Sequence, residues 1–282
     1  MSTVAITGAA RGIGEAIARA LAARGHTLLL GDLDDSVVEL AASLGGVGSV
    51  LDVTDQASYE AWLALVPQVD VLVNNAGVMW VGPFDEEPTA VAERQFAVNV
   101  HGVVRGTRLV LPAMRARRSG LIVTVASAAS VLAPAGEATY AATKHAVHGW
   151  MTAVRQELVG SGVELALVMP TVVETELAAG TSSGGVPRLS PEDVATAVVA
   201  VLDKPRFETF VPARVSVLLR LLSLLPQGGK DAMYRRLVPD QVRSADPAAR
   251  AAYEARRLGQ EAVSRTAGCQ PRSSASRGVP RS

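Results

Sequence analysis

The chain opens with an apolar run that leads into a glycine-rich turn and then into an amphipathic segment. Residues 4–7 read V-A-I-T, residues 8–14 read G-A-A-R-G-I-G, and apolar side chains then recur at helical spacing from Ile13 to Leu21. This order predicts a strand, a tight turn and a helix. Glycines let a pyrophosphate approach the helix N-terminus, where free N–H groups attract anions. The sequence therefore predicts a dinucleotide-binding turn at its start.

The alternation of strand-like and helix-like segments continues along the chain. Apolar runs bounded by turn residues predict further strands at 27–31, 47–51, 69–73, 121–126, 163–169 and 207–211. A helix is expected over 55–66 and another directly after Pro191, with Ser190 as its cap. Repeated alternation predicts an α/β fold with a doubly wound parallel sheet and right-handed crossovers.

Composition narrows the class of protein. The 282 residues include 27 basic and 27 acidic side chains, so the net charge is zero and gives no reason to expect nucleic acid as a partner. Residues 1–3 lead straight into the first strand, so no signal peptide is expected. With a single cysteine, Cys269, and no apolar run of about 18 residues, a cytoplasmic location is expected.

Two residues bear on which nicotinamide dinucleotide is preferred. Asp32 stands at the end of the second strand, where a carboxylate accepts hydrogen bonds from the adenosine ribose hydroxyls and repels a 2′-phosphate. Arg11 in the glycine turn would favour NADP instead, because its guanidinium could bind that phosphate. We favour NAD over NADP, since Asp34 or Asp35 can cap the next helix and leave Asp32 free. Asp52, which ends the third strand, could bond the adenine amine.

A tyrosine and a lysine form the candidate reaction centre. Tyr140 and Lys144 are four residues apart, so they share one face of a helix. A nearby ammonium is expected to lower the pKa of the tyrosine and make it a proton donor or acceptor for an alcohol–carbonyl pair. Ser127 follows a strand thirteen residues before Tyr140, and Ser130 is a competing serine.

These motifs stand in order along the chain, and together they carry a resemblance. T-G-x-x-x-G-x-G at 7–14, N-N-A-G at 74–77, N-V-x-G at 99–102 and the Ser–Tyr–Lys set resemble the classical short-chain dehydrogenases/reductases over roughly residues 3–212. The resemblance implies a Rossmann-like domain that transfers a hydride between NAD(P) and a secondary alcohol or ketone.

The same resemblance assigns roles to single residues. Tyr140 is the acid/base, Lys144 holds the nicotinamide ribose, Ser127 bonds the substrate oxygen, and Asn99 holds a water that links Lys144 to solvent. Pro170, Val173 and Thr175 would contact the nicotinamide amide, although Thr171 replaces the family's usual glycine and puts the shape of that loop in doubt. The implied cofactor-binding residues are Gly8, Arg11, Gly12, Ile13, Gly14, Asp32, Asp52, Val53, Asn75, Ala76, Gly77, Tyr140, Lys144, Pro170, Val173 and Thr175.

Alternatives and partners follow from the same features. Residues 176–190 are rich in Gly and Ser, which predicts a mobile segment, and the resemblance implies that the substrate lid lies there. The few charges in this segment favour an apolar, lipid-, steroid- or retinoid-like substrate. The alternative functions are a non-catalytic dinucleotide-binding sensor or scaffold, an epimerase, or a reductase of a non-carbonyl group. The family resemblance implies a homo-oligomer, a dimer or tetramer. His101, His145 and His148 lack evident companion ligands, so no metal site is expected.

The final third is predicted to be a helical extension, giving a catalytic domain over 1–212, an extension over 213–263 and a disordered tail over 264–282. Residues 215–225 form an apolar helix with a narrow polar stripe, which could pack in the core or a subunit interface, cover the pocket, or lie on a membrane. Because arginines follow this helix, weak peripheral membrane contact through 213–243 is predicted. Residues 246–260 are expected to form a solvent-facing helix.

Overall fold

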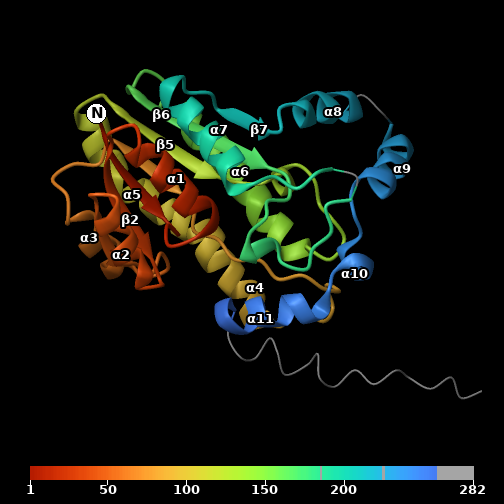
Figure 1. Cartoon of the computed structure of the whole chain (residues 1–282). Helices are drawn as coiled ribbons and strands as arrows, with labels where there is room; N and C mark the ends of the chain where they lie inside the picture. The colour runs from red at the N-terminus through yellow and green to blue at the C-terminus, as the bar shows by residue number, and fades with distance from the viewer. Residues whose placement is uncertain (185, 224–225, 259–282) are drawn as a thin grey trace, which may run out of the picture.

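The computed structural model describes residues 1–184, 186–223 and 226–258, and these contain one seven-stranded parallel sheet with the order β3-β2-β1-β4-β5-β6-β7 (Figure 1). The strands are β1 Thr3–Thr7, β2 Thr27–Asp32, β3 Val47–Val50, β4 Val71–Asn74, β5 Gly120–Val125, β6 Val163–Pro170 and β7 Glu208–Val211. The predicted α/β, doubly wound fold class is therefore confirmed, and strand ends move by at most a few residues.

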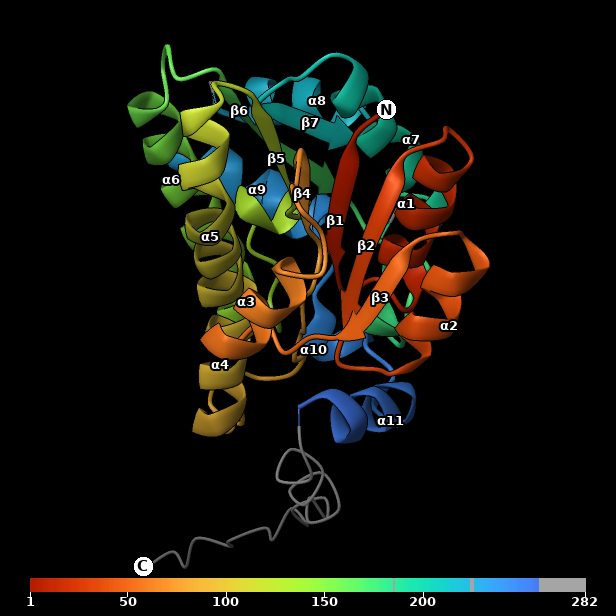
Figure 2. The same ribbon diagram turned by 90° about the vertical axis from the view of Figure 1, so that its left-hand side faces the viewer.

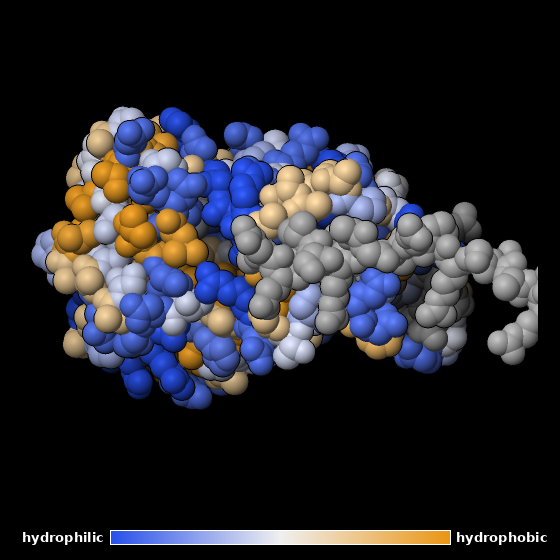
Figure 3. Space-filling model, turned by 90° about the horizontal axis from the view of Figure 1, so that it is seen from below, coloured by the Kyte–Doolittle hydropathy of each residue, from blue (hydrophilic) through white to orange (hydrophobic). Residues whose placement is uncertain are grey.

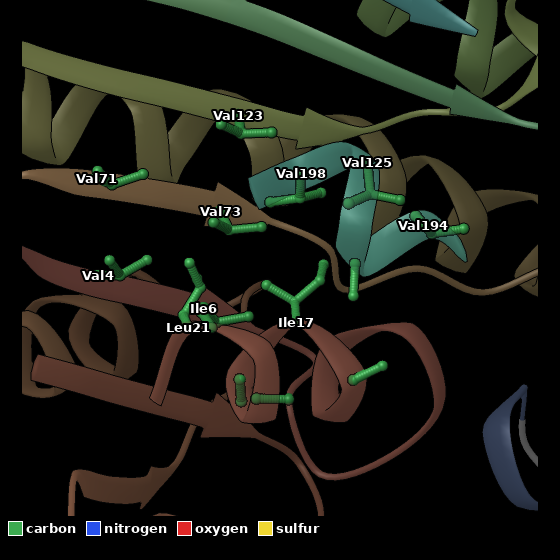
Figure 4. Close-up of a cluster of buried hydrophobic side chains, with 14 of the residues drawn as sticks. Val4, Ile6, Ile17, Leu21, Val71, Val73, Val123, Val125, Val194 and Val198 are labelled. Carbon is green, nitrogen blue, oxygen red and sulfur yellow. The ribbon is translucent and has the colours of Figure 1, made fainter. Parts of the chain in front are cut away.

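Helices cover both faces of the sheet, as Figure 2 shows. One layer contains α1 Gly12–Ala22, α2 Ser36–Ser43 and α7 Pro191–Asp203; the other contains α3 Gln56–Leu63, α5 Val103–Ala116 and α6 Ala138–Glu157. Strand side chains alternate between the two layers, so Val4 and Ile6 face the first and Ala5 the second. Valine, isoleucine and leucine fill the first core between β1, β4, β5, α1 and α7 (Figure 4).

The sheet reverses its winding direction between β1 and β4. The chain runs outward from β1 through β2 to β3, and then returns to place β4 on the other side of β1, with Val4 opposite Val71 and Ile6 opposite Val73. In open α/β sheets a crevice forms outside the carboxyl ends of the strands at such a switch point. The glycine turn after β1 and the residues after β4 therefore meet at one place.

The start of α7 has the predicted cap, and a second helix is capped in the ordinary way. Ser190 and Asp193 form a reciprocal capping box at the start of α7, with Pro191 at the first helical position. Asp55 caps α3 by accepting from the N–H groups of Ala57 and Ser58. Between α4 Thr89–Phe96 and α5 lies a π-helical stretch, η1 Ala97–Gly102. Such stretches are rare and occur often at functional sites.

The C-terminal extension contains α8 Arg214–Ser223, α9 Gln227–Leu237, α10 Gln241–Ser244 and α11 Pro247–Arg257, which returns to lie beside α4 (Figure 1). The prediction that residues 246–260 face solvent is wrong for α11, because Arg250, Tyr253 and Glu254 are all buried. They lie at positions i, i+3 and i+4 and so share one face. The polar helix can be buried because its charged groups find partners, as described below.

The described part of α8 gives a mixed picture of the apolar helix. Val215 is buried, whereas Val217 and Leu218 are exposed. No side chain from Arg214 to Leu218 lines the cavity described below, so this part of α8 does not cover it. Among the described residues, no helix has both the length and the apolar character needed to cross a membrane. The predicted disordered tail, with Cys269, lies outside the described residues.

Exposed apolar side chains do not form one continuous surface on the lower face. Figure 3 shows hydrophobic residues on that face in patches that hydrophilic residues interrupt. Exposed large apolar side chains of the described residues come from several elements, including Leu33, Val38, Val50, Leu65 and Phe96. The predicted dimer or tetramer remains a prediction.

Candidate active site

A cavity of about 880 Å³ lies at the carboxyl ends of the strands. It is lined by the glycine turn after β1, by the segments that follow β2 to β6, by α6, and by residues of the C-terminal extension. A cavity of this size is in the range that holds a cofactor or a drug-sized molecule. Of the predicted cofactor residues, all line it except Gly14, and of the predicted catalytic residues, all line it except Asn99.

The glycine turn is shaped to leave room for a ligand backbone. Gly8 and Gly12 have positive φ angles of 64° and 54°, which side chains with a Cβ rarely adopt. A Cβ on Gly8 would lie 2.8 Å from the Cα atom of Ala76. Gly14 serves packing instead, because a Cβ there would overlap the carbonyl oxygen of Gly8. This glycine cradle at the start of α1 fits the pyrophosphate of a dinucleotide.

Asn75 braces the turn from the neighbouring strand. Its Nδ2 donates to the carbonyl oxygens of Thr7 at 3.0 Å and Gly8 at 2.8 Å. The hydroxyl oxygen of Thr7 in turn accepts from the N–H groups of Asn75 and Ala76 at 3.0 and 3.1 Å. These four bonds link the β1 turn to the segment after β4 and fix the floor of the cavity at the switch point.

Asp32 lines the cavity beside the glycine turn and is oriented by backbone groups. Its carboxylate accepts from the N–H of Ala10 and from the N–H of Asp34, each at 3.0 Å. Burial raises the pKa of Asp32, and the Ala10 N–H and the charge of Arg11 oppose that rise. Since a carboxylate has about four acceptor positions, two remain for ribose hydroxyls.

Arg11 is already engaged by two carboxylates. Its guanidinium pairs with Asp34 and donates to Glu176 at 3.2 Å. Asp34 also accepts from the N–H of Ser36, the first residue of α2, whereas the N-cap residue Asp35 makes no capping bond with its side chain. Asp52 lines the cavity, and its Oδ1 accepts from the N–H and hydroxyl of Thr54 at 2.8 and 2.7 Å. One carboxylate oxygen of Asp52 is left to face the cavity.

Tyr140 and Lys144 lie one turn apart on α6 and both line the cavity. The Nζ atom of Lys144 is 5.5 Å from the centre of the Tyr140 ring and donates to the carbonyl oxygen of Val125 at 3.4 Å. Burial lowers the pKa of Lys144 to about 8. The helix spacing therefore brings the phenol and the ammonium together as the sequence predicts.

The prediction that the pKa of Tyr140 is lowered is wrong. Burial raises the pKa of Tyr140 above its ordinary value, the charge of Glu137 adds to that rise, and a hydrogen bond with the Ser127 side chain opposes it. Desolvation disfavours the charged phenolate more than the nearby side chains favour it. The phenol therefore stays protonated at neutral pH, which suits a proton donor.

Ser127, and not Ser130, lies in the candidate reaction centre. Ser127 lines the cavity, accepts from the N–H of Ala129 at 3.0 Å and is hydrogen-bonded to Tyr140. Ser130 is buried away from the cavity, and its hydroxyl has no hydrogen-bond partner within the described residues. The structure thus separates the two serines that the sequence leaves in competition.

Asn99 lies one layer behind the cavity, in η1. Its Nδ2 donates to the carbonyl oxygen of Val78 at 2.9 Å and to the hydroxyl of Thr143 at 3.1 Å, and its Oδ1 accepts from the N–H of Val78 at 2.9 Å. These bonds join η1 to α6 and to the segment after β4. Asn99 therefore fixes the elements that carry the reaction centre, while the predicted water-holding role remains a prediction.

The loop after β6 keeps a regular shape in spite of Thr171. Its N–H donates to the carbonyl oxygen of Val211 at 3.0 Å, which continues the pairing of β6 with β7. Thr171 is not among the described residues with a positive φ, so a threonine is tolerated where the family usually has glycine. Val173 pairs with Leu189, and Thr175 precedes the short helix η3 Glu176–Ala178.

Three residues of α11 line the cavity, Tyr253, Arg256 and Arg257, and Arg250 of the same helix contacts the segments beside it. The sequence interpretation missed the place of all four in this region. Tyr253 lines the cavity, and its hydroxyl oxygen accepts from the N–H of Met79 at 3.2 Å. Arg250 donates to the carbonyl oxygens of Met79 and Leu177, each at 2.6 Å, and pairs with Glu254 at 3.1 Å. A single tyrosine on an otherwise Ala/Arg helix was the available signal for a buried face.

The same extension holds the segment that we call the lid, residues 176–184. Gln241 exchanges two hydrogen bonds of 2.8 Å with the backbone of Ser182, and the N–H of Asp246 donates to the carbonyl oxygen of Gly180 at 2.8 Å. Arg256 and Arg257 approach Glu176 at 3.4 and 3.8 Å. The lid is therefore fastened to residues that follow it by about 60 positions along the chain.

The histidines do not gather with other ligands. His148 lies 2.8 Å from the Glu208 carboxylate, a companion the sequence did not reveal, and His145 bonds the carbonyl oxygen of Ala141. Within the part of the chain that the structure describes, no three His, Cys, Asp or Glu side chains are close enough together to hold a metal ion.

This geometry agrees with the comparison to known proteins. The family model described as short chain dehydrogenase matches residues 2–184. The chain is 36% identical over 204 residues to the oxidoreductase UcpA of Salmonella typhimurium, covering 69% of this chain and 77% of that protein. It is 34% identical over 183 residues to the 3-oxoacyl-[acyl-carrier-protein] reductase FabG of Escherichia coli, covering 61% and 73%. The chain belongs to the short-chain dehydrogenase/reductase family.

Solved structures agree in fold. A short-chain dehydrogenase/reductase from Burkholderia phymatum in complex with NAD is 26% identical, covers 87% of this chain and 97% of its own, and superimposes with a TM-score of 0.73. An alcohol dehydrogenase from the archaeon Thermococcus sibiricus, complexed with 5-hydroxy-NADP, is 30% identical, covers 74% and 95%, and gives a TM-score of 0.65. As a member of this family, the protein is an oxidoreductase with a Rossmann-like dinucleotide-binding fold.

Proposed function

We propose that this oxidoreductase interconverts a secondary alcohol and the corresponding ketone on an apolar substrate. The observation that carries the proposal is the meeting of Ser127, Tyr140 and Lys144 on one wall of the cavity, next to the glycine cradle. A carbonyl carbon beside that wall would lie within reach of both a proton donor and the dinucleotide, which is the arrangement the reaction needs.

Each residue would have a separate task. The bound dinucleotide supplies or accepts the hydride. Ser127 would hold the substrate oxygen by a hydrogen bond, and the Tyr140 phenol would donate its proton to that oxygen during reduction or take it back during oxidation. Since burial raises the pKa of Tyr140, the phenol carries its proton at neutral pH, and ketone reduction is the direction that this favours. The Lys144 ammonium would hold the nicotinamide ribose.

The substrate end of the cavity supports an apolar substrate. Its walls include Leu132, Val186 and Val238, together with the lid residues Leu177 and Ala178. Apolar walls bind hydrocarbon surface because they remove it from water, at roughly 25 cal/mol per Å². The reduction of a 3-oxoacyl group, the reaction in the name of one relative, is compatible with the same reaction centre and is therefore included in the test.

The preference for NAD is also part of the proposal. Two acceptor positions of Asp32 remain for the ribose hydroxyls, and a 2′-phosphate would meet the negative charge of this side chain. Arg11, the group that could have received the phosphate, is engaged by Asp34 and Glu176. Both observations favour the dinucleotide without the phosphate.

The deciding experiment compares the wild type with Tyr140→Phe. Medium-chain 2-ketones and a 3-oxoacyl thioester are offered with NADH and with NADPH, and turnover is followed by absorbance of the reduced nicotinamide. The wild type should reduce the ketones, while Tyr140→Phe should lose at least about a thousandfold in kcat and bind NADH with unchanged Kd. Turnover by the variant at the wild-type rate would contradict the proposal, and so would NADH binding by a wild type that reduces no ketone, which is the result expected of a sensor.

A further inference from the structure

Glu137 is a buried carboxyl group in the cavity wall, and neither the reaction nor the fold accounts for it. It immediately precedes α6, three residues before Tyr140, and lines the cavity. Its exposed fraction is only 8%. A side chain at this position often bonds the free N–H groups of its own helix, but Glu137 makes no such bond. Its side chain is therefore free to face the cavity.

Within the described residues, no hydrogen bond or ion pair to the Glu137 carboxyl occurs. The cation whose charge acts on it is Arg250. That guanidinium is committed elsewhere, because it donates to backbone carbonyls of Met79, Leu177 and Ala179 and to the carboxylate of Glu254. The positive charge of Arg250 thus acts on Glu137 from a distance, but Arg250 donates no hydrogen bond to it.

Other polar groups that line the cavity already have partners. The hydroxyl of Tyr140 is bonded to Ser127, and the ammonium of Lys144 donates to the carbonyl oxygen of Val125. The hydroxyl oxygen of Tyr253 accepts from the N–H of Met79. A buried carboxyl group without a hydrogen-bond donor is unfavourable. A molecule in the cavity can remove that penalty by offering a donor.

We propose that Glu137 is a substrate-binding residue that accepts a hydrogen bond from a hydroxyl group on the substrate, away from the carbon that reacts. The proposal rests on the proposed function, and it narrows the substrate class to apolar diols and hydroxyketones. The reacting oxygen would be held by Ser127 and Tyr140, and the second oxygen by Glu137. Because Glu137 and Tyr140 lie on adjacent turns at the start of α6, the two oxygens would be bound by one rigid element.

A hydroxyl fits this position better than a charged group. Burial raises the pKa of Glu137 to about 7, so the carboxyl is present in both protonation states near neutral pH. A hydroxyl can donate to the ionised form and accept from the neutral form, whereas an ammonium pairs only with the ionised form. A substrate carboxylate would be repelled by ionised Glu137 and by Glu254, which lies beside Arg250.

The test measures binding and does not need turnover. In the presence of saturating NADH, alcohols bind without reacting, so 2-decanol and a series of decanediols with one hydroxyl at carbon 2 are titrated by calorimetry. The wild type should bind at least one diol roughly tenfold to a hundredfold more tightly than 2-decanol, the range expected for one hydrogen bond to a charged group. Glu137→Leu should abolish this preference, and Glu137→Gln should retain part of it because its amide oxygen still accepts.

The control is the same pair of substitutions at Glu157, an exposed residue at the other end of α6. A wild type that binds no diol more tightly than 2-decanol overturns the proposal. So does a loss of affinity in Glu137→Leu that is equal for 2-decanol and the diols. The proposed function fails separately: a diol preference that depends on Glu137, in a protein that reduces no ketone, would support the binding role and reject the reaction.

Discussion

The guanidinium of Arg250 donates a hydrogen bond to the carbonyl oxygen of Met79 at 2.6 Å, across 171 positions of sequence. The same side chain reaches two carbonyl oxygens of the lid, those of Leu177 and Ala179. One buried cation therefore joins α11, the segment after β4, and the lid. We expect Arg250 to act as a positioning residue for the side of the cavity formed by the lid and Tyr253, which we call the substrate wall.

Replacing Arg250 should separate substrate binding from cofactor binding. Arg250→Met leaves three carbonyl oxygens and Glu254 without their donor, and removing one partner of a buried pair is unfavourable by about 3–5 kcal/mol. We expect a lower melting temperature, a KM for ketones raised at least about tenfold, and a Kd for NADH that is nearly unchanged, because the glycine cradle is held by Asn75 and not by α11.

Two matched variants make that result specific. Arg250→Lys keeps the charge but cannot supply the forked set of donors, so its KM should lie between those of the wild type and Arg250→Met. Arg243→Met removes an arginine that is 87% exposed and should change nothing. Equal loss of ketone and NADH binding in Arg250→Met would indicate a general loss of structure and contradict the positioning role.

The pH dependence of ketone reduction should be governed by Lys144. Burial lowers its pKa from the ordinary 10.5 to about 8, so the ammonium is present below pH 8 and lost above it, while Tyr140 keeps its proton throughout. We expect kcat/KM for reduction to be level between pH 6 and 7.5 and to fall above about pH 8. The profile is measured by NADH oxidation from pH 6 to 10. In Lys144→Arg, whose charge persists, any remaining activity should not fall at pH 8; a level wild-type profile up to pH 10 would refute the assignment.

Glu137 should make the free energy of unfolding depend on pH. Its pKa in the folded protein is raised from 4.5 to about 7, so between these values the folded state holds a proton that the unfolded state releases. The free energy of unfolding therefore falls as pH rises from about 4.5 to 7. This difference between the two pKa values changes the free energy of unfolding by at most about 3 kcal/mol.

Glu137→Gln has no charge to bury. Its free energy of unfolding should therefore exceed that of the wild type only at higher pH. We expect similar urea midpoints for the two proteins at pH 5 and a higher midpoint for the variant at pH 8. Glu157→Gln, an exposed change on the same helix, should follow the wild type at both. An advantage of Glu137→Gln that is the same at pH 5 and pH 8 would show that ionisation is not its cause.

Asp32 should set the preference between the two dinucleotides. Asp32→Asn removes the charge that would repel a 2′-phosphate, and its single amide oxygen can still accept from one of the two N–H groups, of Ala10 and Asp34, that the carboxylate binds. The ratio of the Kd for NADPH to that for NADH, measured by nicotinamide fluorescence, should fall by roughly tenfold or more, as for the loss of one charged contact. Asp35→Asn, an exposed neighbour, should leave the ratio unchanged.

The fold was predictable because its signals are local. Each strand is an apolar run, the turns carry glycines, and parallel pairing follows from strand–helix alternation. Tyr140 and Lys144 could be paired because helix geometry fixes neighbours four residues apart. The choice between Ser127 and Ser130 needed the structure, since both lie in one short loop and only the fold decides which hydroxyl turns toward the cavity.

The errors concern burial, which depends on partners far away in sequence. The pKa of Tyr140 rises because other elements remove water from the phenol, an effect that the Y-x-x-x-K motif cannot reveal. Arg250 and Tyr253 read as part of a polar surface helix because their partners, Met79 and the lid, precede them by more than 70 positions. The burial of Glu137 could not be predicted from the sequence for the same reason.

Helix α11 helps to form one side of the cavity but contributes no buried residue to the two main cores. The sheet and the glycine cradle are built without α11, whose buried residues belong to neither main core, whereas the substrate wall is finished by Tyr253 and by the lid that Arg250 fastens. We therefore expect changes at Arg250 and Tyr253 to alter which molecules are accepted, whereas Arg256 and Arg257 at the end of the same helix meet Glu176, the partner of Arg11 in the glycine turn. A terminal segment grafted from a relative would accordingly have to supply its own partner for that glutamate.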